Sequence, residues 1–197
     1  MMQVVLVDSG GANLGSVRYA LERLGVKAPL ASDAEALAAA THVILPGVGA
    51  AAPAMARLGE LGLIAPPRAM DKPLLGVCLG MQLLFEGSDE GDVECLGLIP
   101  GRVKSMPAAP GVRIPHMGWN RLQGVADSPL LEGLPDPAFA YFVHGYAAPV
   151  GPHTVAVSEH GTPFSAMVRR GRLHGAQFHP ERSAAVGSRI LENFLEL

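Results

Sequence analysis

The sequence has few cysteines and no long uninterrupted apolar run. Only Cys78 and Cys95 are present, which is too few for a disulfide framework in a chain of this size, so we expect a reducing, cytoplasmic setting. No run of about 18 apolar residues escapes interruption by proline, glycine or charge, which argues against a transmembrane helix. Residues 1–5 (MMQVV) lack the positive region and long apolar stretch of a signal peptide. We therefore expect no membrane contact.

Neither charge sign dominates, and aromatic residues are scarce. Fifteen basic residues against eighteen acidic ones leave a net charge of −3, so nothing suggests a general affinity for nucleic acid. Hydrophobic residues make up 49% of the chain but aromatic ones only 5%, so the core is built from Ala, Val, Leu and Ile. A length of 197 residues suffices for one good-sized core. We expect a single domain over residues 1–197.

The first half of the chain alternates strand and helix patterns. Strands are expected at residues 3–8, 26–31, 42–45 and 73–77. Between and after them, helices are expected before Gly25, after a cap at Ser32 or Asp33, within residues 50–70 as one or two helices broken around Pro66-Pro67, and at Met81 to Phe85 as the start of a helix. Such alternation predicts a flavodoxin-like α/β fold with a mainly parallel sheet and helices on both faces. Ligands of such sheets bind beyond the carboxyl ends of the strands, where Asp8, residues 46–49 and Cys78 would meet.

After Glu90 the pattern changes to short strands separated by glycine and proline. The expected strands are residues 99–105, 114–120, 139–146, 154–158, 163–169 and 173–178. They predict an antiparallel hairpin extension of the sheet. A final helix with Val186, Ile190 and Phe194 on one face should close over the core.

One stretch combines a buried strand with a thiol at its end. Cys78 directly follows the apolar run 73–77 and lies between Gly76 and Gly80. Gly-x-Cys-x-Gly is the thiol counterpart of the nucleophile elbow, a tight strand-to-helix turn that holds a reactive atom out of the sheet. Glycines suit this turn because a Cβ on either side would clash, and a helix N-terminus favours the thiolate form. The alternative is a buried structural cysteine between two packing glycines.

The last apolar strand ends in a base and a carboxylate. His179 and Glu181 flank Pro180, which fixes φ and blocks helix there. A thiol nucleophile needs a base within hydrogen-bond reach, and the base needs an orienting acceptor. Cys78, His179 and Glu181 supply these three groups, although His-x-Glu by itself is more often a surface pair.

A zinc site is a further alternative for the cysteine. One Cys with the scattered His42, His116, His144 and His174 has no metal-ligand spacing. We therefore expect neither a metal nor a cofactor.

The two motifs together form a far more specific pattern. GVCLGMQ at residues 76–82 with HPE at residues 179–181 resembles the triad (class I) glutamine amidotransferases. Within that family, the similarity is to the glutaminase subunits of imidazole glycerol phosphate synthases, enzymes of histidine biosynthesis. It is carried by PGVG at 46–49, PHMGWN at 115–120, YFVHGY at 141–146 and the opening Asp8…Asn13 stretch, and it runs from about Val4 to the C-terminus.

The resemblance assigns roles to individual residues. Cys78 would attack the side-chain amide of L-glutamine, His179 would carry the proton to the leaving ammonia, and Glu181 would hold the imidazole. The oxyanion would be bound by the backbone N–H of Leu79 and by the loop containing Val48 and Gly49. Substrate contacts would come from Gly47, Gln82, Glu90, Gly145 and Tyr146.

The resemblance also implies a partner, a (β/α)8-barrel cyclase subunit that receives the ammonia within a heterodimer. We expect the docking face around Asn13, Trp119 and Tyr141, because Trp and Tyr commonly anchor interfaces. Three residues depart from the usual family pattern: Ser9 replaces an aromatic, Ala12 a glycine, and Gly145 a Ser or Thr. We place the first two at the partner face, while the third keeps the backbone N–H and loses only a hydroxyl.

Two other functions compete with this interpretation. One is a stand-alone thiol hydrolase or another triad amidotransferase, such as the vitamin B6 synthase glutaminase, which usually carries Ala after the cysteine. The other is a flavodoxin-like binding module in which Cys78 is inert. The HMGWN stretch argues against the first, and His179 with Glu181 argues against the second.

Overall fold

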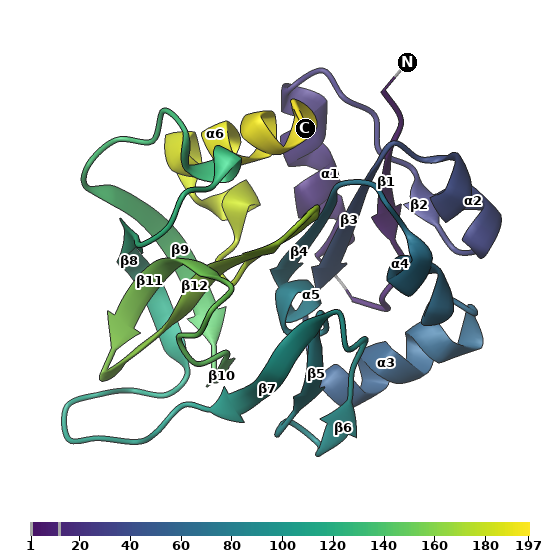
Figure 1. Ribbon diagram of the computed structural model, residues 1–197. Helices are drawn as coiled ribbons and strands as arrows, with labels where there is room; N and C mark the ends of the chain where they lie inside the picture. Colours follow the sequence, from purple (N-terminus) through teal and green to yellow (C-terminus); the bar gives the residue numbers. More distant parts are fainter. Residues whose placement is uncertain (1, 12) are drawn as a thin grey trace.

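A mixed sheet forms the centre of the fold in this computed structural model, which describes residues 2–11 and 13–197 (Figure 1). In the described part of the chain it has nine strands in the order β2-β1-β3-β4-β13-β12-β11-β8-β9. Their bounds are β1 Val4–Val7, β2 Leu30–Ala31, β3 His42–Gly47, β4 Leu74–Cys78, β8 His116–Gly124, β9 Ala138–His144, β11 Thr154–His160, β12 Thr162–Arg170 and β13 Leu173–Ala176. Ala12, which we expected at the partner face, lies outside the described residues.

The strand pairing agrees with the predicted fold class. Strands β2, β1, β3, β4 and β13 run parallel to one another. From β13 onward, β12, β11, β8 and β9 are antiparallel to their neighbours. The sheet is therefore a parallel half extended by antiparallel hairpins.

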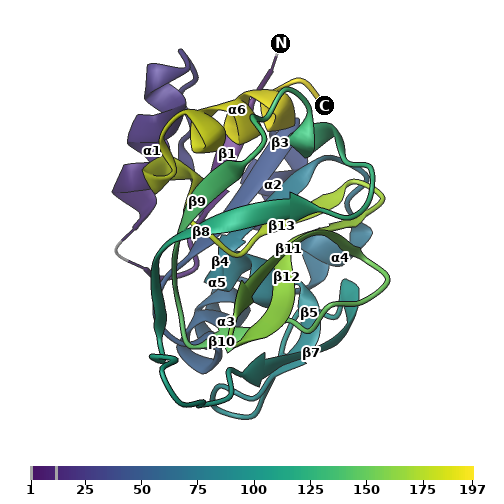
Figure 2. The same cartoon turned by 90° about the vertical axis from the view of Figure 1, so that its left-hand side faces the viewer.

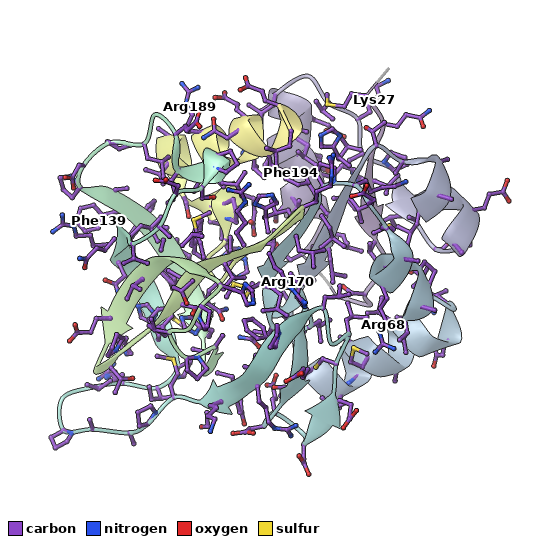
Figure 3. All side chains as sticks on the ribbon, in the orientation of Figure 1. Lys27, Arg68, Phe139, Arg170, Arg189 and Phe194 are labelled. Carbon is purple, nitrogen blue, oxygen red and sulfur yellow. The ribbon has the colours of Figure 1, made fainter. Side chains whose placement is uncertain are left out.

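Helices bury both faces of the parallel half. They are α1 Leu14–Arg23, α2 Ala34–Ala39, α3 Ala51–Glu60, α4 Ala65–Ala69, α5 Leu79–Gln82 and α6 Ala184–Leu195. Val4 and Leu6 of β1 pack into one core with α1 and α6, whereas Val5 and Val7 pack into a second core with α2 and α3. Figure 2 shows α1 and α6 together over one face. In Figure 3, Phe194 points from α6 toward the sheet, while Phe139 lies at the outer side of β9.

Several element boundaries follow from local chemistry. Asp33 caps α2 as predicted, because its Oδ1 accepts from the Ala36 N–H at 2.8 Å. The predicted helix break at Pro66-Pro67 is wrong. The break falls at residues 61–64, and both prolines lie in the first turn of α4, where a missing N–H costs nothing.

A second, smaller sheet was not predicted. It has the order β10-β7-β5-β6, with β5 Phe85–Ser88, β6 Val93–Glu94, β7 Ile99–Ser105 and β10 Tyr146–Ala147. The helix expected from Met81 to Phe85 is therefore wrong in its extent: α5 ends at Gln82, and Phe85 begins β5. Because β5 pairs in parallel with β7, contacts distant in sequence decide the conformation of this apolar stretch.

Two short 3-10 helices complete the fold, η1 Pro129–Leu131 and η2 Pro180–Arg182. Within the described residues, no helix has both the length and the apolar character needed to cross a membrane.

Candidate active site

Cys78 lies at a sharp turn between β4 and α5. Its backbone has φ 53° and ψ −113°, a left-handed conformation that is costly for a residue with a side chain. A Cβ at Gly80 would lie 1.7 Å from the Leu45 carbonyl oxygen, and one at Gly76 would lie 2.7 Å from the Met81 nitrogen. The two glycines are thus required by close packing of β3, β4 and α5. The predicted elbow is present.

His179 and Glu181 are held together directly beyond β13. His179 Nδ1 lies 2.8 Å from Glu181 Oε1, and both side chains are buried. Burial alone would lower the pKa of His179, but hydrogen bonds with the Cys78 and Glu181 side chains outweigh it and raise that pKa. Burial alone would raise the pKa of Glu181, but hydrogen bonds from His179 and Asn13 lower it. The geometry therefore favours an imidazolium at His179 paired with the Glu181 carboxylate.

Asn13 contributes to this cluster, although the sequence placed it at a partner face. Its Nδ2 donates to Glu181 Oε1 at 2.6 Å and lies 3.4 Å from His179 Nδ1. As the N-cap residue of α1 it makes no side-chain cap, because its amide is directed at the carboxylate instead. Asn13 therefore helps to orient the carboxylate that orients the base.

The predicted site residues line one pocket of about 290 Å³, close to the smallest ligand sites of about 300 Å³. The pocket is lined by Val48, Gly49, Cys78, Leu79, Gln82, Glu90, Pro115, Val143, His144, Gly145, Tyr146 and His179. All of the proposed catalytic, oxyanion and substrate residues are in this set except Gly47 and Glu181. Gly47 pairs with Cys78, and Glu181 is hydrogen-bonded to His179, so each contacts a residue that lines the pocket.

The loop after β3 faces the nucleophile. Gly47 pairs in register with Cys78, and a Cβ at Gly47 would lie 2.8 Å from the Gly80 nitrogen. Gly49 has φ +97° with open space around it, and Val48 lies against Gly11. The loop is thus fixed at Gly47 by packing, while Gly49 has a backbone conformation that suits only glycine.

Gln82 and Glu90 make protein contacts within the pocket wall. Gln82 Nε2 donates to the Tyr146 carbonyl at 2.9 Å and to Gln177 Oε1 at 3.0 Å. Glu90 Oε2 accepts from the Ala51 N–H at 3.1 Å, at the start of α3. Both amide hydrogens of Gln82 are therefore used, and only its Oε1 is left for a ligand.

Two of the three predicted docking residues, Trp119 and Tyr141, lie on the outer face of the β8–β9 hairpin. Trp119 is 55% exposed, and its ring centroid lies 6.0 Å from that of Tyr141. The Tyr141 backbone faces the site: its carbonyl accepts from the His179 N–H at 2.9 Å, and its N–H donates to Ser183 Oγ at 3.0 Å. We call Met117, Trp119, Phe139 and Tyr141 the hairpin face.

Two residues at the end of β1 have structural roles. Ser9, expected at the partner face, is instead buried. Its Oγ donates to the Pro46 carbonyl at 2.5 Å, which satisfies the buried hydroxyl. Asp8 is outside the pocket and binds Arg57 Nη2 at 2.7 Å. The hydrogen bond from Arg57 lowers the pKa of Asp8.

The scattered histidines do not form a metal site. Among the residues that the structure describes, no group of three or more His, Cys, Asp or Glu side chains could hold a metal ion. His116 and His144 are instead paired through Nδ1 and Nε2 at 3.0 Å. Burial lowers the pKa of His116 to about 4 and that of His144 to about 3.

The sequence did not indicate all of the groups at this site. Pro115, Val143 and His144 line the pocket, and the fully buried Gln177 directs its amide at Cys78. Pro115 and His144 belong to the motifs already singled out, and Gln177 lies in the stretch that ends at Glu181. Their positions follow from strand pairing rather than from a recognisable spacing.

Comparison with known proteins gives one consistent family. The family described as glutamine amidotransferase class-I matches residues 5–197. The chain is 64% identical to the imidazole glycerol phosphate synthase subunit HisH of Xanthomonas axonopodis pv. citri, over 100% of this chain and 98% of that protein. It is 60% identical to the protein of the same name from Xylella fastidiosa (strain Temecula1), again over 100% and 98%.

Solved structures share the same fold. A crystal structure described as a glutamine amidotransferase has a TM-score of 0.75 at 23% identity, over 98% of this chain and 97% of that one. PurLQS from Thermotoga maritima has a TM-score of 0.71 at 20% identity, over 100% and 99%. At such identities the likeness concerns the fold alone.

Proposed function

The chain belongs to the class-I glutamine amidotransferase family, and from this premise we propose that it is the glutaminase subunit of an imidazole glycerol phosphate synthase. It hydrolyses L-glutamine to glutamate and ammonia. The ammonia passes to a cyclase subunit that makes imidazole glycerol phosphate and aminoimidazole carboxamide ribotide in histidine biosynthesis. The proposal is supported by the names of relatives that are 60–64% identical over the whole chain.

The geometry supports a two-step mechanism. Cys78 Sγ attacks the side-chain amide carbon of glutamine, and His179 moves the thiol proton to the leaving nitrogen, so that ammonia departs and a thioester forms. His179 then takes a proton from water, which attacks the thioester carbonyl. The carbon–sulfur bond breaks, and its electron pair stays on the sulfur. Glu181 orients the imidazole and stabilises its charged form.

The pocket walls suit an amino acid. In this proposal Glu90 takes the α-ammonium group, and the backbone of Gly145 and Tyr146 takes the α-carboxylate, because all three residues line the pocket. Gln82 would meet the substrate through Oε1, since its Nε2 hydrogens are bound elsewhere. The Leu79 N–H and the Val48 loop would bind the oxyanion.

The observation that carries this proposal is the convergence of Cys78 and His179 at one pocket, with Glu181 hydrogen-bonded to His179. An assay of glutamate release from glutamine, with and without a candidate cyclase, tests it. Release in the presence of the cyclase supports the proposal. If no glutamate is released with any (β/α)8-barrel cyclase from the same organism, the assigned function is wrong.

We place the cyclase on the hairpin face, as one half of a heterodimer in the cytoplasm. The exposed Trp119 ring lies against the half-buried Tyr141 ring, and such aromatic pairs are typical interface anchors. Ammonia released into water would be protonated at neutral pH, so direct transfer from a closed site favours the synthase reaction. Both cysteines are free thiols, as expected in a reducing compartment.

Replacing Trp119 or Tyr141 with alanine should weaken binding of the cyclase by about tenfold or more, because each removes a large apolar contact. Titration calorimetry with the purified cyclase measures the effect. Leu30→Ala is the matched control: Leu30 is 49% exposed but lies in β2, at the opposite edge of the sheet. Unchanged affinity in both aromatic variants would place the docking surface elsewhere.

The glycines around Val48 suggest that the partner controls turnover. If the Val48 N–H completes the oxyanion site only in the loaded complex, the isolated chain lacks one donor, and turnover should rise about 100- to 1,000-fold on assembly. The KM for glutamine should change much less. An isolated chain that already works at the full rate would show that this switch does not exist.

Gly49→Ala tests the loop directly. Alanine disfavours the φ of +97° seen at this position, so the ratio of turnover with and without the cyclase should change by about tenfold or more. Gly62→Ala is the control, because Gly62 also has a positive φ and open space but lies between α3 and α4. An unchanged ratio in Gly49→Ala, with Gly62→Ala also unchanged, would exclude the loop as the switch.

A further inference from the structure

A chain of buried hydrogen bonds leads from the pocket wall to the Cys78 sulfur. Gln82 Nε2 lies 2.9 Å from the Tyr146 carbonyl oxygen and 3.0 Å from Gln177 Oε1. Gln177 Nε2 in turn lies 3.8 Å from Cys78 Sγ. Gln177 is fully buried and does not line the pocket, so its amide is available to the sulfur but not to a ligand.

The direction of this chain follows from hydrogen-bond chemistry. The Tyr146 carbonyl can only accept, so Gln82 must present its NH2 group to it. The same NH2 group faces Gln177, which must therefore present its carbonyl oxygen. The NH2 group of Gln177 is left to point at Cys78. Turning Gln82 around would bring its Oε1 against the Tyr146 carbonyl oxygen, and turning Gln177 around would bring two NH2 groups together, so either change leaves unpaired polar atoms at a buried site.

A pair of histidines fixes the Tyr146 end of this series of hydrogen bonds. His144 Nδ1 lies 2.9 Å from the same Tyr146 carbonyl, so this nitrogen carries a hydrogen. Burial lowers the pKa of His144 to about 3, so the ring is neutral and its Nε2 accepts from His116 Nδ1. The Tyr146 carbonyl thus receives two donors, from Gln82 and from His144, and its position is well determined.

We propose that Gln177 is a further catalytic group, whose amide N–H stabilises the Cys78 thiolate, and that Gln82 is the positioning residue that keeps this N–H directed at the sulfur. The proposal rests on the glutaminase function and adds to it a donor outside the triad and the oxyanion loop. Hydrogen bonds to charged acceptors are about twice as strong as neutral ones, so the contact gains strength when the sulfur becomes charged.

The sulfur exchanges partners during the reaction. Cys78 Sγ also lies 3.8 Å from the Val143 carbonyl, to which the neutral thiol donates. Once His179 has taken the proton, the sulfur can only accept, and Gln177 is the amide donor beside it. The same N–H stabilises the sulfur again when the thioester breaks down and the electron pair returns to it. Gln177 therefore favours both formation and departure of the thiolate.

Gln177→Met removes the donor and keeps a side chain of similar length. We expect kcat for glutamine in the complex with the cyclase to fall about 10- to 100-fold, the loss of one hydrogen bond to a charged group. KM should change less than about threefold, because Gln177 does not line the pocket. In a Cys95→Ala background, the midpoint of the pH profile for iodoacetamide alkylation of Cys78 should rise by about one to two pH units.

Gln82→Glu tests whether Gln82 orients the Gln177 amide, and it leaves Gln177 itself unchanged. A carboxylate cannot donate, and a protonated carboxyl gives its single hydrogen to the Tyr146 carbonyl. In either state Gln177 should turn its NH2 group toward Glu at position 82 and its oxygen toward the sulfur. The midpoint of Cys78 alkylation should rise at least as far as in Gln177→Met, which gives a second test should that variant fail to fold.

Asn193→Leu separates this effect from a general loss of stability. Asn193 is a buried amide on α6 that donates to the Leu130 and Glu132 carbonyls, away from the pocket. Its replacement also removes buried hydrogen bonds but should leave the alkylation profile unchanged. A wild-type profile in folded Gln177→Met and Gln82→Glu would overturn the proposal. Absence of glutamine hydrolysis in the wild-type complex would instead refute the proposed function, since alkylation requires no glutamine.

Discussion

Cys78→Ser should lower the rate of glutamine hydrolysis by at least about ten-thousandfold, because a serine hydroxyl is far less acidic than a thiol and the proposed attack requires loss of that proton. The change is nearly isosteric at a residue that is 7% exposed, so the chain should stay folded. Glutamate release with the cyclase present measures the activity, and circular dichroism verifies the fold. Hydrolysis at the wild-type rate would exclude Cys78 as the nucleophile.

Cys95→Ala is the matched control for that experiment. Cys95 is also buried, but it has no elbow and no neighbouring base, and burial raises the pKa of its thiol to about 11. This variant should keep its activity. A diazo-ketone analogue of glutamine should likewise label Cys78 alone, as peptide mass spectrometry would show.

His179→Ala should cause a loss of about a thousandfold to ten-thousandfold, since it removes both the base and the cation that stabilises the thiolate. The loss should be seen in kcat, with alkylation of Cys78 at pH 6 slowed in parallel. Glu181→Gln should cost less, about a hundredfold, because an amide oxygen can still accept from His179 Nδ1 but cannot stabilise imidazolium. If Glu181→Gln were as damaging as His179→Ala, the carboxylate would have a larger role than orientation.

The features that could be predicted are those with a local physical cause. The pattern Gly-x-Cys-x-Gly predicted the elbow, and the structure explains it by backbone contacts at Gly76 and Gly80 that leave no space for a Cβ. Strand β7 was predicted with its observed bounds, and the helix carrying Val186, Ile190 and Phe194 buries all three side chains. In each case a pattern among neighbouring residues was sufficient to predict the element, even where, as at Gly80, a distant residue makes the close contact.

The features that were missed depend on partners distant in the sequence. Residues 83–85 are apolar and fit either a helix or a strand, but Leu83 and Leu84 form a turn, and Phe85 begins β5 by pairing with Ile99 of β7. The inward direction of Asn13 depends on Glu181, which is 168 residues away. The amide direction of Gln177 likewise depends on Gln82 and on the Tyr146 carbonyl. No spacing within a motif encodes such relations.

Strand β9 connects the proposed partner face to the catalytic base and the pocket. Its outer side bears Phe139 and Tyr141 of the hairpin face, its inner side bears His144 of the pocket, and its backbone binds His179. If the proposed interface is correct, we expect a substitution that changes the partner contacts of β9 also to affect His179 and the pocket. Substitutions at the proposed interface are therefore limited by the need to keep His179 and the pocket in place. A change of partner would require changes at several positions of β9 together.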